Sequence, residues 1–192
     1  MLNSRTEILI NMKTFVIAEA GANHDRNFDQ ATTLIDVAKR YGASAVKFQT
    51  YSSETMYCKN TPDFAGYKNI NQLIKDMELP REWQKDLKQY CDETGIEFMS
   101  TPFDLASIDL LHDLQLEIFK IPSSEIVNLP YLRKIGKLNK KVILSTGMST
   151  MKEIGDALNI LVNSGTEKSR ISVLHVNSEY PTPMEDVNLR AM

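Results

Sequence analysis

Short apolar runs of strand length alternate with stretches of helical spacing along most of the chain. Runs typical of strands cover six segments: residues 15–20, 45–50, 96–101, 117–122, 141–146 and 171–177. Between the first two, Ala31, Leu34, Ile35 and Ala38 recur at helical spacing, and Gly42 follows as a stop signal. This alternation predicts an α/β fold with a parallel sheet.

Capping signals and spacing predict the helices after the second strand. Four are expected: one opened by Pro80 and ended by Gly95, one capped by Asp104, one over residues 130–138, and one whose capping box joins Thr150 to Glu153. A longer connection, residues 51–79, contains a short helical stretch around residues 70–77. A connection of that length after a strand is often functional.

Six strand–helix units are too few to close a barrel. A (β/α)₈ barrel uses about 250 residues, whereas this chain has 192. We therefore expect one domain over residues 1–192, a TIM-type (β/α)₈ barrel that is incomplete in this chain. An open, doubly wound sheet is the alternative fold, although no Gly-rich phosphate turn supports it.

Composition narrows the classes of function. The 22 basic and 25 acidic side chains leave a net charge of −3, which excludes a strongly basic nucleic-acid binder. No apolar run approaches the length of about 18 residues that a membrane span needs, and residues 1–11 lack a signal-peptide core. Cys58 and Cys91 lack metal-ligand spacing. We expect a cytoplasmic protein with neither nucleic acid nor membrane as a partner.

Polar side chains recur where the predicted strands end. They comprise Glu19, Lys47, Gln49, Thr101, Lys120, Ser123, Glu125, Ser145 and Ser178. The carboxyl ends of parallel strands are where α/β folds bind ligands. Strand alternation places Lys47 and Gln49 on one face and Phe48 on the other. Each residue alone has an ordinary structural explanation, but their recurrence predicts a pocket for an anionic ligand such as a phosphate or carboxylate.

Six motifs carry a resemblance to a known family. They are IAEAGANH (17–24), AVKFQT (45–50), STPFD (100–104), FKIPSSE (119–125), LSTGMS (144–149) and EYPTP (179–183). In these motifs the chain resembles the sialic acid synthases, which include N-acetylneuraminate, legionaminate and pseudaminate synthases. The resemblance covers about residues 14–192.

The resemblance implies a transferase of carbohydrate biosynthesis. Its enzymes condense phosphoenolpyruvate with an N-acetylated aminohexose, N-acetylmannosamine or a diacetamido relative, to a nonulosonic acid and phosphate. By motif, the residues expected to bind phosphoenolpyruvate are Lys47, Thr101, Lys120, Ser123, Ser145 and Ser178. Those expected at the sugar are Glu19, Gln49, Glu125 and Tyr180, and the catalytic residues would be Glu19, Lys47, Lys120 and Glu125.

The resemblance also implies parts that lie beyond Met192. The family uses manganese or magnesium, bound by histidines of the last two strands, so we expect no metal ligands in this chain. It also carries a C-terminal antifreeze-like domain and forms a homodimer. We therefore expect little activity from the isolated chain.

Two other functions remain open from the sequence. A synthase that joins phosphoenolpyruvate to a phosphorylated sugar would need a second basic cluster, and the strand ends show only Lys47 and Lys120. A non-catalytic fragment that binds an anionic ligand or a partner chain is the alternative from a different class.

Overall fold

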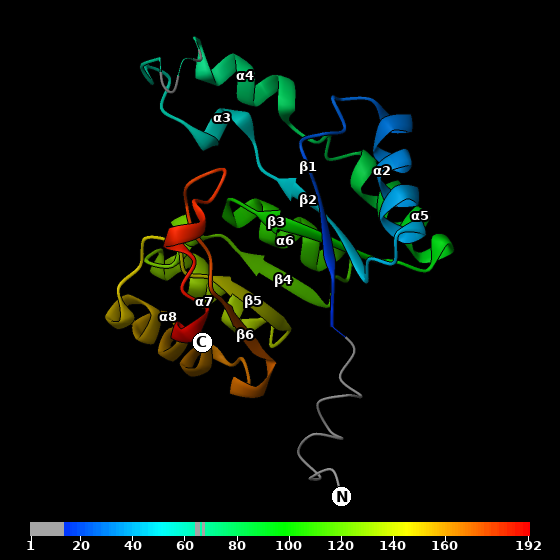
Figure 1. Cartoon of the computed structure of the whole chain (residues 1–192). Helices are drawn as coiled ribbons and strands as arrows, with labels where there is room; N and C mark the ends of the chain where they lie inside the picture. Colours follow the sequence, from blue (N-terminus) through cyan, green and yellow to red (C-terminus); the bar gives the residue numbers. More distant parts are fainter. Residues whose placement is uncertain (1–13, 64–65, 67) are drawn as a thin grey trace, which may run out of the picture.

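Two three-stranded parallel ladders form the centre of the molecule. The computed structural model describes residues 14–63, 66 and 68–192. The first ladder has the order β1 (Ile17–Gly21), β2 (Ala45–Thr50), β3 (Glu97–Pro102), and the second has the order β4 (Ile118–Ile121), β5 (Lys141–Ser145), β6 (Ile171–Leu174). Strand β4 lies beside β3 (Figure 1), although no ladder pairing joins them in the described part of the chain. The carboxyl ends of all six strands therefore lie at one end of the molecule.

Helices lie along the outer side of the strands (Figure 1). The five that connect successive strands are α2 (Phe28–Arg40), α5 (Trp83–Thr94), α6 (Leu105–Asp113), α7 (Leu129–Lys137) and α8 (Met151–Ser164). Their apolar faces pack on outward-facing strand residues such as Phe48 and Phe98, whose rings stack 5.8 Å apart between centroids. The main hydrophobic core thus lies between strands and helices.

A second, smaller apolar cluster fills the opposite face of the strands. Ala45, Met99 and Ile118 are buried there, with Ile17 and Ile143 packed against them. All five residues belong to strands, one residue from each of β1 to β5. This inner layer lies directly below the polar residues that follow it along each strand.

Strand β2 and helix α4 (Ile70–Met77) match the expected bounds to the residue. The ends of β1, β3, β4 and β5 lie within two residues of the expected ones. Strand β6 ends at Leu174, whereas the sequence predicts a strand to residue 177. Its partner β5 ends at Ser145, and the Leu174 carbonyl then accepts a hydrogen bond from Thr146 Oγ1 at 2.8 Å. Ser178 consequently lies on the loop after β6.

Helix termini confirm several capping signals. Thr150 and Glu153 form the expected capping box at the start of α8, and Gly95 ends α5 in the left-handed conformation at φ 74°. Pro80 does not open α5, because residues 80–82 form a turn and Trp83 N–H donates to the Pro80 carbonyl. The turn sets α5 three residues later than the sequence predicts.

The long connection after β2 carries two short helices. Helix α3 (Ser53–Met56) and α4 project beyond the carboxyl end of the first ladder (Figure 1). Asp104 joins this connection to the strands, since its Oδ2 accepts from Ser52 N–H while Oδ1 caps α6 through Ser107 N–H. The residues expected to lack a signal-peptide core, 1–11, lie outside the described part of the chain. Within that part, no helix has the length and apolarity to cross a membrane.

Candidate functional site

Glu19, Lys47 and Thr101 meet at the carboxyl end of the first ladder. Glu19 and Lys47 are register partners on β1 and β2, and the Lys47 ammonium forms an ion pair with the Glu19 carboxylate. Lys47 Nζ also donates to Thr101 Oγ1 on β3 at 3.3 Å. The Lys47 side chain is 12% exposed and that of Glu19 is 49% exposed, so the lysine lies inside and the carboxylate lies at the rim.

Lys120 places a second ammonium group beside the first. It lies on β4, and its Nζ donates to the Ile121 carbonyl at 3.0 Å. Burial lowers the pKa of Lys120 to about 8, and repulsion from the Lys47 ammonium adds to this effect, while Glu19 opposes it. The two ladders therefore bring two lysines and one carboxylate together, an arrangement that favours binding of an anion with more than one negative charge.

A second group of candidate residues lies at the end of the other ladder. Ser123 Oγ accepts a hydrogen bond from the Gly147 backbone N–H at 2.9 Å. Ser178 approaches the same glycine, since a Cβ placed on Gly147 would lie 2.3 Å from Ser178 Oγ. Ser123, an ordinary candidate for a helix cap, does not cap the short helix that it begins, Ser123–Glu125. Its hydroxyl is instead held on the loop between β5 and α8.

Glu125 is held by a residue that the sequence did not single out. Asn128 Nδ2 donates to Glu125 Oε2 at 2.6 Å, while Asn128 Oδ1 caps α7 by accepting from Tyr131 N–H. One asparagine therefore both begins a helix and fixes the orientation of a candidate catalytic carboxylate. The spacing of Asn128 three residues before Tyr131 is a capping signal that reveals the first role only.

The remaining candidates differ in how closely the structure places them. Gln49 faces Thr101 as its register partner across β2 and β3. Ser145 is buried at the end of β5, and its side chain makes no hydrogen bond to any described residue. Tyr180 is 90% exposed on the loop after β6, and the structure does not bring it against the other candidates.

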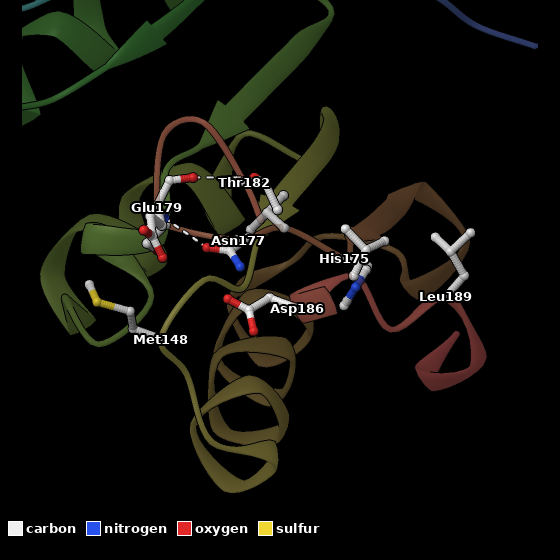
Figure 2. A pocket seen from close by; sticks show the side chains of 10 residues that line it. Met148, His175, Asn177, Glu179, Thr182, Asp186 and Leu189 are labelled. Atoms are coloured by element: carbon white, nitrogen blue, oxygen red, sulfur yellow. Dashed lines mark hydrogen bonds between the residues drawn. The ribbon is translucent and has the colours of Figure 1, made fainter. Parts of the chain in front are cut away.

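A cavity of about 860 Å³ opens at the carboxyl end of β6. Ser178, Asn177 and Asp186 line it together with the exposed Met148, whose φ of 56° is left-handed. Figure 2 shows Asn177 and Asp186 facing its centre, with Glu179 fixed by a bond from its N–H to Asn177 Oδ1 at 2.7 Å. The cavity reaches the candidate residues through Ser178, so it offers room for a ligand next to the serine group.

The described residues do not form a metal centre. Across residues 14–63, 66 and 68–192, no group of three or more His, Cys, Asp or Glu side chains lies close enough to hold a metal ion. The side chains that converge are instead two ammonium groups, hydroxyls and one carboxylate. Two ammonium groups repel a divalent cation, so this group of side chains fits an anion and not the divalent metal that the resemblance implies.

Comparison with known proteins gives concordant matches. The model of the NeuB family matches residues 34–192. N,N'-diacetyllegionaminic acid synthase of Campylobacter jejuni is 46% identical over 187 residues, covering 94% of this chain and 56% of the relative. Human N-acetylneuraminate-9-phosphate synthase is 30% identical over 184 residues, covering 93% of this chain and 50% of the relative. The chain thus spans about half the length of the curated relatives that it matches.

Solved structures give the same result for the fold. The N-acetylneuraminic acid (sialic acid) synthetase of Leptospira borgpetersenii, solved in complex with citrate, matches with a TM-score of 0.85 and 35% identity. That match covers 94% of this chain and 60% of the synthetase. A truncated 3-deoxy-D-arabino-heptulosonate 7-phosphate synthase of Thermotoga maritima matches with a TM-score of 0.60 at 17% identity, covering 83% of this chain and 50% of that one. The second match supports the α/β fold alone.

Proposed function

Because this chain belongs to the NeuB family, we propose that it forms the phosphoenolpyruvate-binding part of a sialic-acid-type synthase. The relatives that it matches include legionaminic, pseudaminic and N-acetylneuraminate-9-phosphate synthases. The reaction proposed here joins phosphoenolpyruvate to an N-acetylated aminohexose, N-acetylmannosamine or a diacetamido relative. Its products are a nonulosonic acid and inorganic phosphate.

The convergence of Lys47 and Lys120 is the observation that carries the proposal. Phosphoenolpyruvate combines a phosphate with a carboxylate, so its charge matches two adjacent ammonium groups. Lys47 already holds Glu19 and Thr101, and Lys120 has only the Ile121 carbonyl as a recorded acceptor in the described chain. An arriving anion favours the protonated form of Lys120, because opposite charge raises the pKa of an amine.

Phosphoenolpyruvate and the sugar then react by addition to the sugar aldehyde. The C2–C3 double bond of phosphoenolpyruvate supplies the electron pair for the new bond from C3 to the aldehyde carbon, and the aldehyde oxygen takes up a proton. Water adds to the cationic C2 and loses a proton. The C2–O bond to phosphate then breaks as the new C2 hydroxyl gives up its proton to the departing phosphate, which leaves a ketone at C2. In this scheme the lysines neutralise the charge on phosphate, and Glu125, held by Asn128, orients the water.

We further propose that the six strands belong to a (β/α)₈ barrel that additional strands close. Strands β1 and β6 each pair with one neighbour in the described chain. Apolar side chains are exposed beside both: Tyr41 is 81% and Val37 45% exposed next to β1, and Val173 is 46% and Val162 39% exposed at β6 and α8. Hollows of about 330 Å³ and about 350 Å³ lie at these two edges, where neighbouring barrel elements would pack.

Release of phosphate that depends on both substrates tests the proposed function. We expect the full-length protein, supplied with Mn²⁺ or Mg²⁺, to release phosphate from phosphoenolpyruvate only when an N-acetylated aminohexose is present. A panel of N-acetylmannosamine and diacetamido sugars identifies the acceptor. If no sugar of the panel supported the release of phosphate, the proposal would be contradicted. Release of phosphate without any sugar would contradict it as well.

A further inference from the structure

Gly147 occupies the point where the serine group converges. It lies on the loop that leads from β5 into α8, within the motif LSTGMS. Its N–H donates to Ser123 Oγ at 2.9 Å. Because the Ser123 oxygen accepts this bond, its own hydroxyl proton remains available, and it has no acceptor among the described residues.

With Ser178 in its present position, there is no room for a side chain at position 147. A Cβ on Gly147 would lie 2.3 Å from Ser178 Oγ, 3.1 Å from Ser123 Oγ and 3.4 Å from Val176 Cγ2. Contacts below 3.0 Å are essentially never made by real Cβ atoms, so Ser178 would have to move. Gly147 does not have the positive φ that favours glycine elsewhere in the chain. Its conformation would therefore tolerate alanine, whereas the present position of the Ser178 hydroxyl would not.

We propose that Gly147 is a positioning residue for phosphoenolpyruvate, because its missing side chain lets the Ser123 and Ser178 hydroxyls approach the same ligand oxygens. This inference rests on the proposed function. The N–H of Gly147 polarises the Ser123 hydroxyl, and a hydroxyl that accepts one hydrogen bond donates a stronger one. Ser178 also lines the cavity at the carboxyl end of β6, so its hydroxyl lies at the edge of open space.

Alanine at position 147 should therefore reduce binding while it leaves the fold intact. The two atoms nearest the added methyl group are side-chain hydroxyls, and neither belongs to the backbone. Ser178 can rotate about χ1 to relieve the clash, and this rotation turns its hydroxyl away from the ligand. Loss of one hydrogen bond to a charged group corresponds to about a 10- to 100-fold loss of affinity.

The test measures the Kd of phosphoenolpyruvate by isothermal titration calorimetry with the full-length protein and its variants. We expect Gly147→Ala to weaken binding by at least about tenfold. Gly155→Ala is the matched control, since a Cβ at Gly155 meets no atom within 4 Å, and its Kd should equal that of the wild type. An unchanged Kd in Gly147→Ala would overturn the inference and leave the proposed function standing. A wild type that does not bind phosphoenolpyruvate would overturn both.

A double variant separates positioning from general damage and covers the case in which Gly147→Ala alone does not fold. If Gly147 acts by positioning Ser178, adding Gly147→Ala to Ser178→Ala should cost less than about threefold in Kd, because the displaced hydroxyl is already absent. The two changes would then be strongly non-additive. A double variant whose loss equals the product of the single losses would overturn the inference.

Discussion

At the scale of single residues, Lys120 shows the physical cost of the candidate site. Burial and the neighbouring Lys47 lower its pKa to about 8. An unfolded chain binds this proton more tightly than the folded chain does, since an unperturbed lysine titrates near pH 10.5. The free energy of unfolding should therefore rise as the pH increases from about 8 towards 10.5, and the full penalty is present below pH 8.

Replacing this lysine should stabilise the protein. We expect Lys120→Met to raise the free energy of unfolding at pH 7 by about 1–3 kcal/mol, because it removes a buried ammonium group whose one hydrogen-bond acceptor among the described residues is the Ile121 carbonyl. Urea denaturation measures the change, and the gain should shrink near pH 10. Lys152→Met is the surface control; because its ion pair with Asp156 is exposed, its free energy of unfolding should match that of the wild type. A loss of stability in Lys120→Met would show that Lys120 supports the fold.

Residues on strands were easier to predict than residues on loops. Glu19 and Lys47 lie near the carboxyl ends of the first two predicted strands, which indicates one shared edge of the sheet, and the structure joins them in an ion pair. Asn128 and Gly147 escaped prediction because their contacts, with Glu125 and Ser123, depend on how two loops fold against one another. No periodic pattern reports such geometry.

At the scale of elements, α7 and α8 are packed closely against each other at their carboxyl ends. A Cβ on Gly136 in α7 would lie 2.6 Å from Ser164 Cβ and 3.0 Å from the Leu161 carbonyl oxygen of α8. Thr166 Oγ1, just after α8, donates to the Gly136 carbonyl at 3.1 Å. The two helices thus approach each other through a glycine and a serine.

Two substitutions of the same kind should have opposite effects on stability. Gly136→Ala should lower the free energy of unfolding by about 1–3 kcal/mol, because crowding against α8 outweighs the helix propensity of alanine. Gly155→Ala on α8 meets no neighbour, so it should raise the free energy of unfolding by up to about 1 kcal/mol. Thermal or urea unfolding measures both. A stabilised Gly136→Ala would contradict the close packing of the two helices.

Element types could be predicted from the sequence better than their ends. The strand patterns and caps gave the order of strands and helices, with β2 and α4 matching to the residue. The end of β6 was wrong by three residues because a strand ends where its partner does, at Ser145 of β5, and pairing is invisible in one sequence. The predicted start of α5 is three residues too early for a local reason: residues 80–82 form a turn, and the helix begins at Trp83.

At the scale of the whole molecule, the candidate site spans the junction of the two ladders. Lys47 and Thr101 belong to the first ladder. Lys120 belongs to β4 of the second ladder, and Ser123 follows that strand. Strands β3 and β4 meet side by side without ladder bonds in the described chain. The inner apolar layer, the main hydrophobic core and the hydrogen bond from the Tyr131 hydroxyl to the Pro102 carbonyl at 2.7 Å hold the two halves together. A ligand bound to both lysines would bridge this junction.

Equilibrium binding of phosphoenolpyruvate tests most directly whether the two ladders form one anion site. The full-length wild type should bind phosphoenolpyruvate, and Lys47→Met and Lys120→Met, one from each ladder, should each weaken binding by at least about 100-fold. Lys152→Met, at the surface of α8, should bind as the wild type does. If Lys120→Met bound phosphoenolpyruvate with unchanged affinity, the second ladder would not contribute its lysine, and the proposed site would be contradicted.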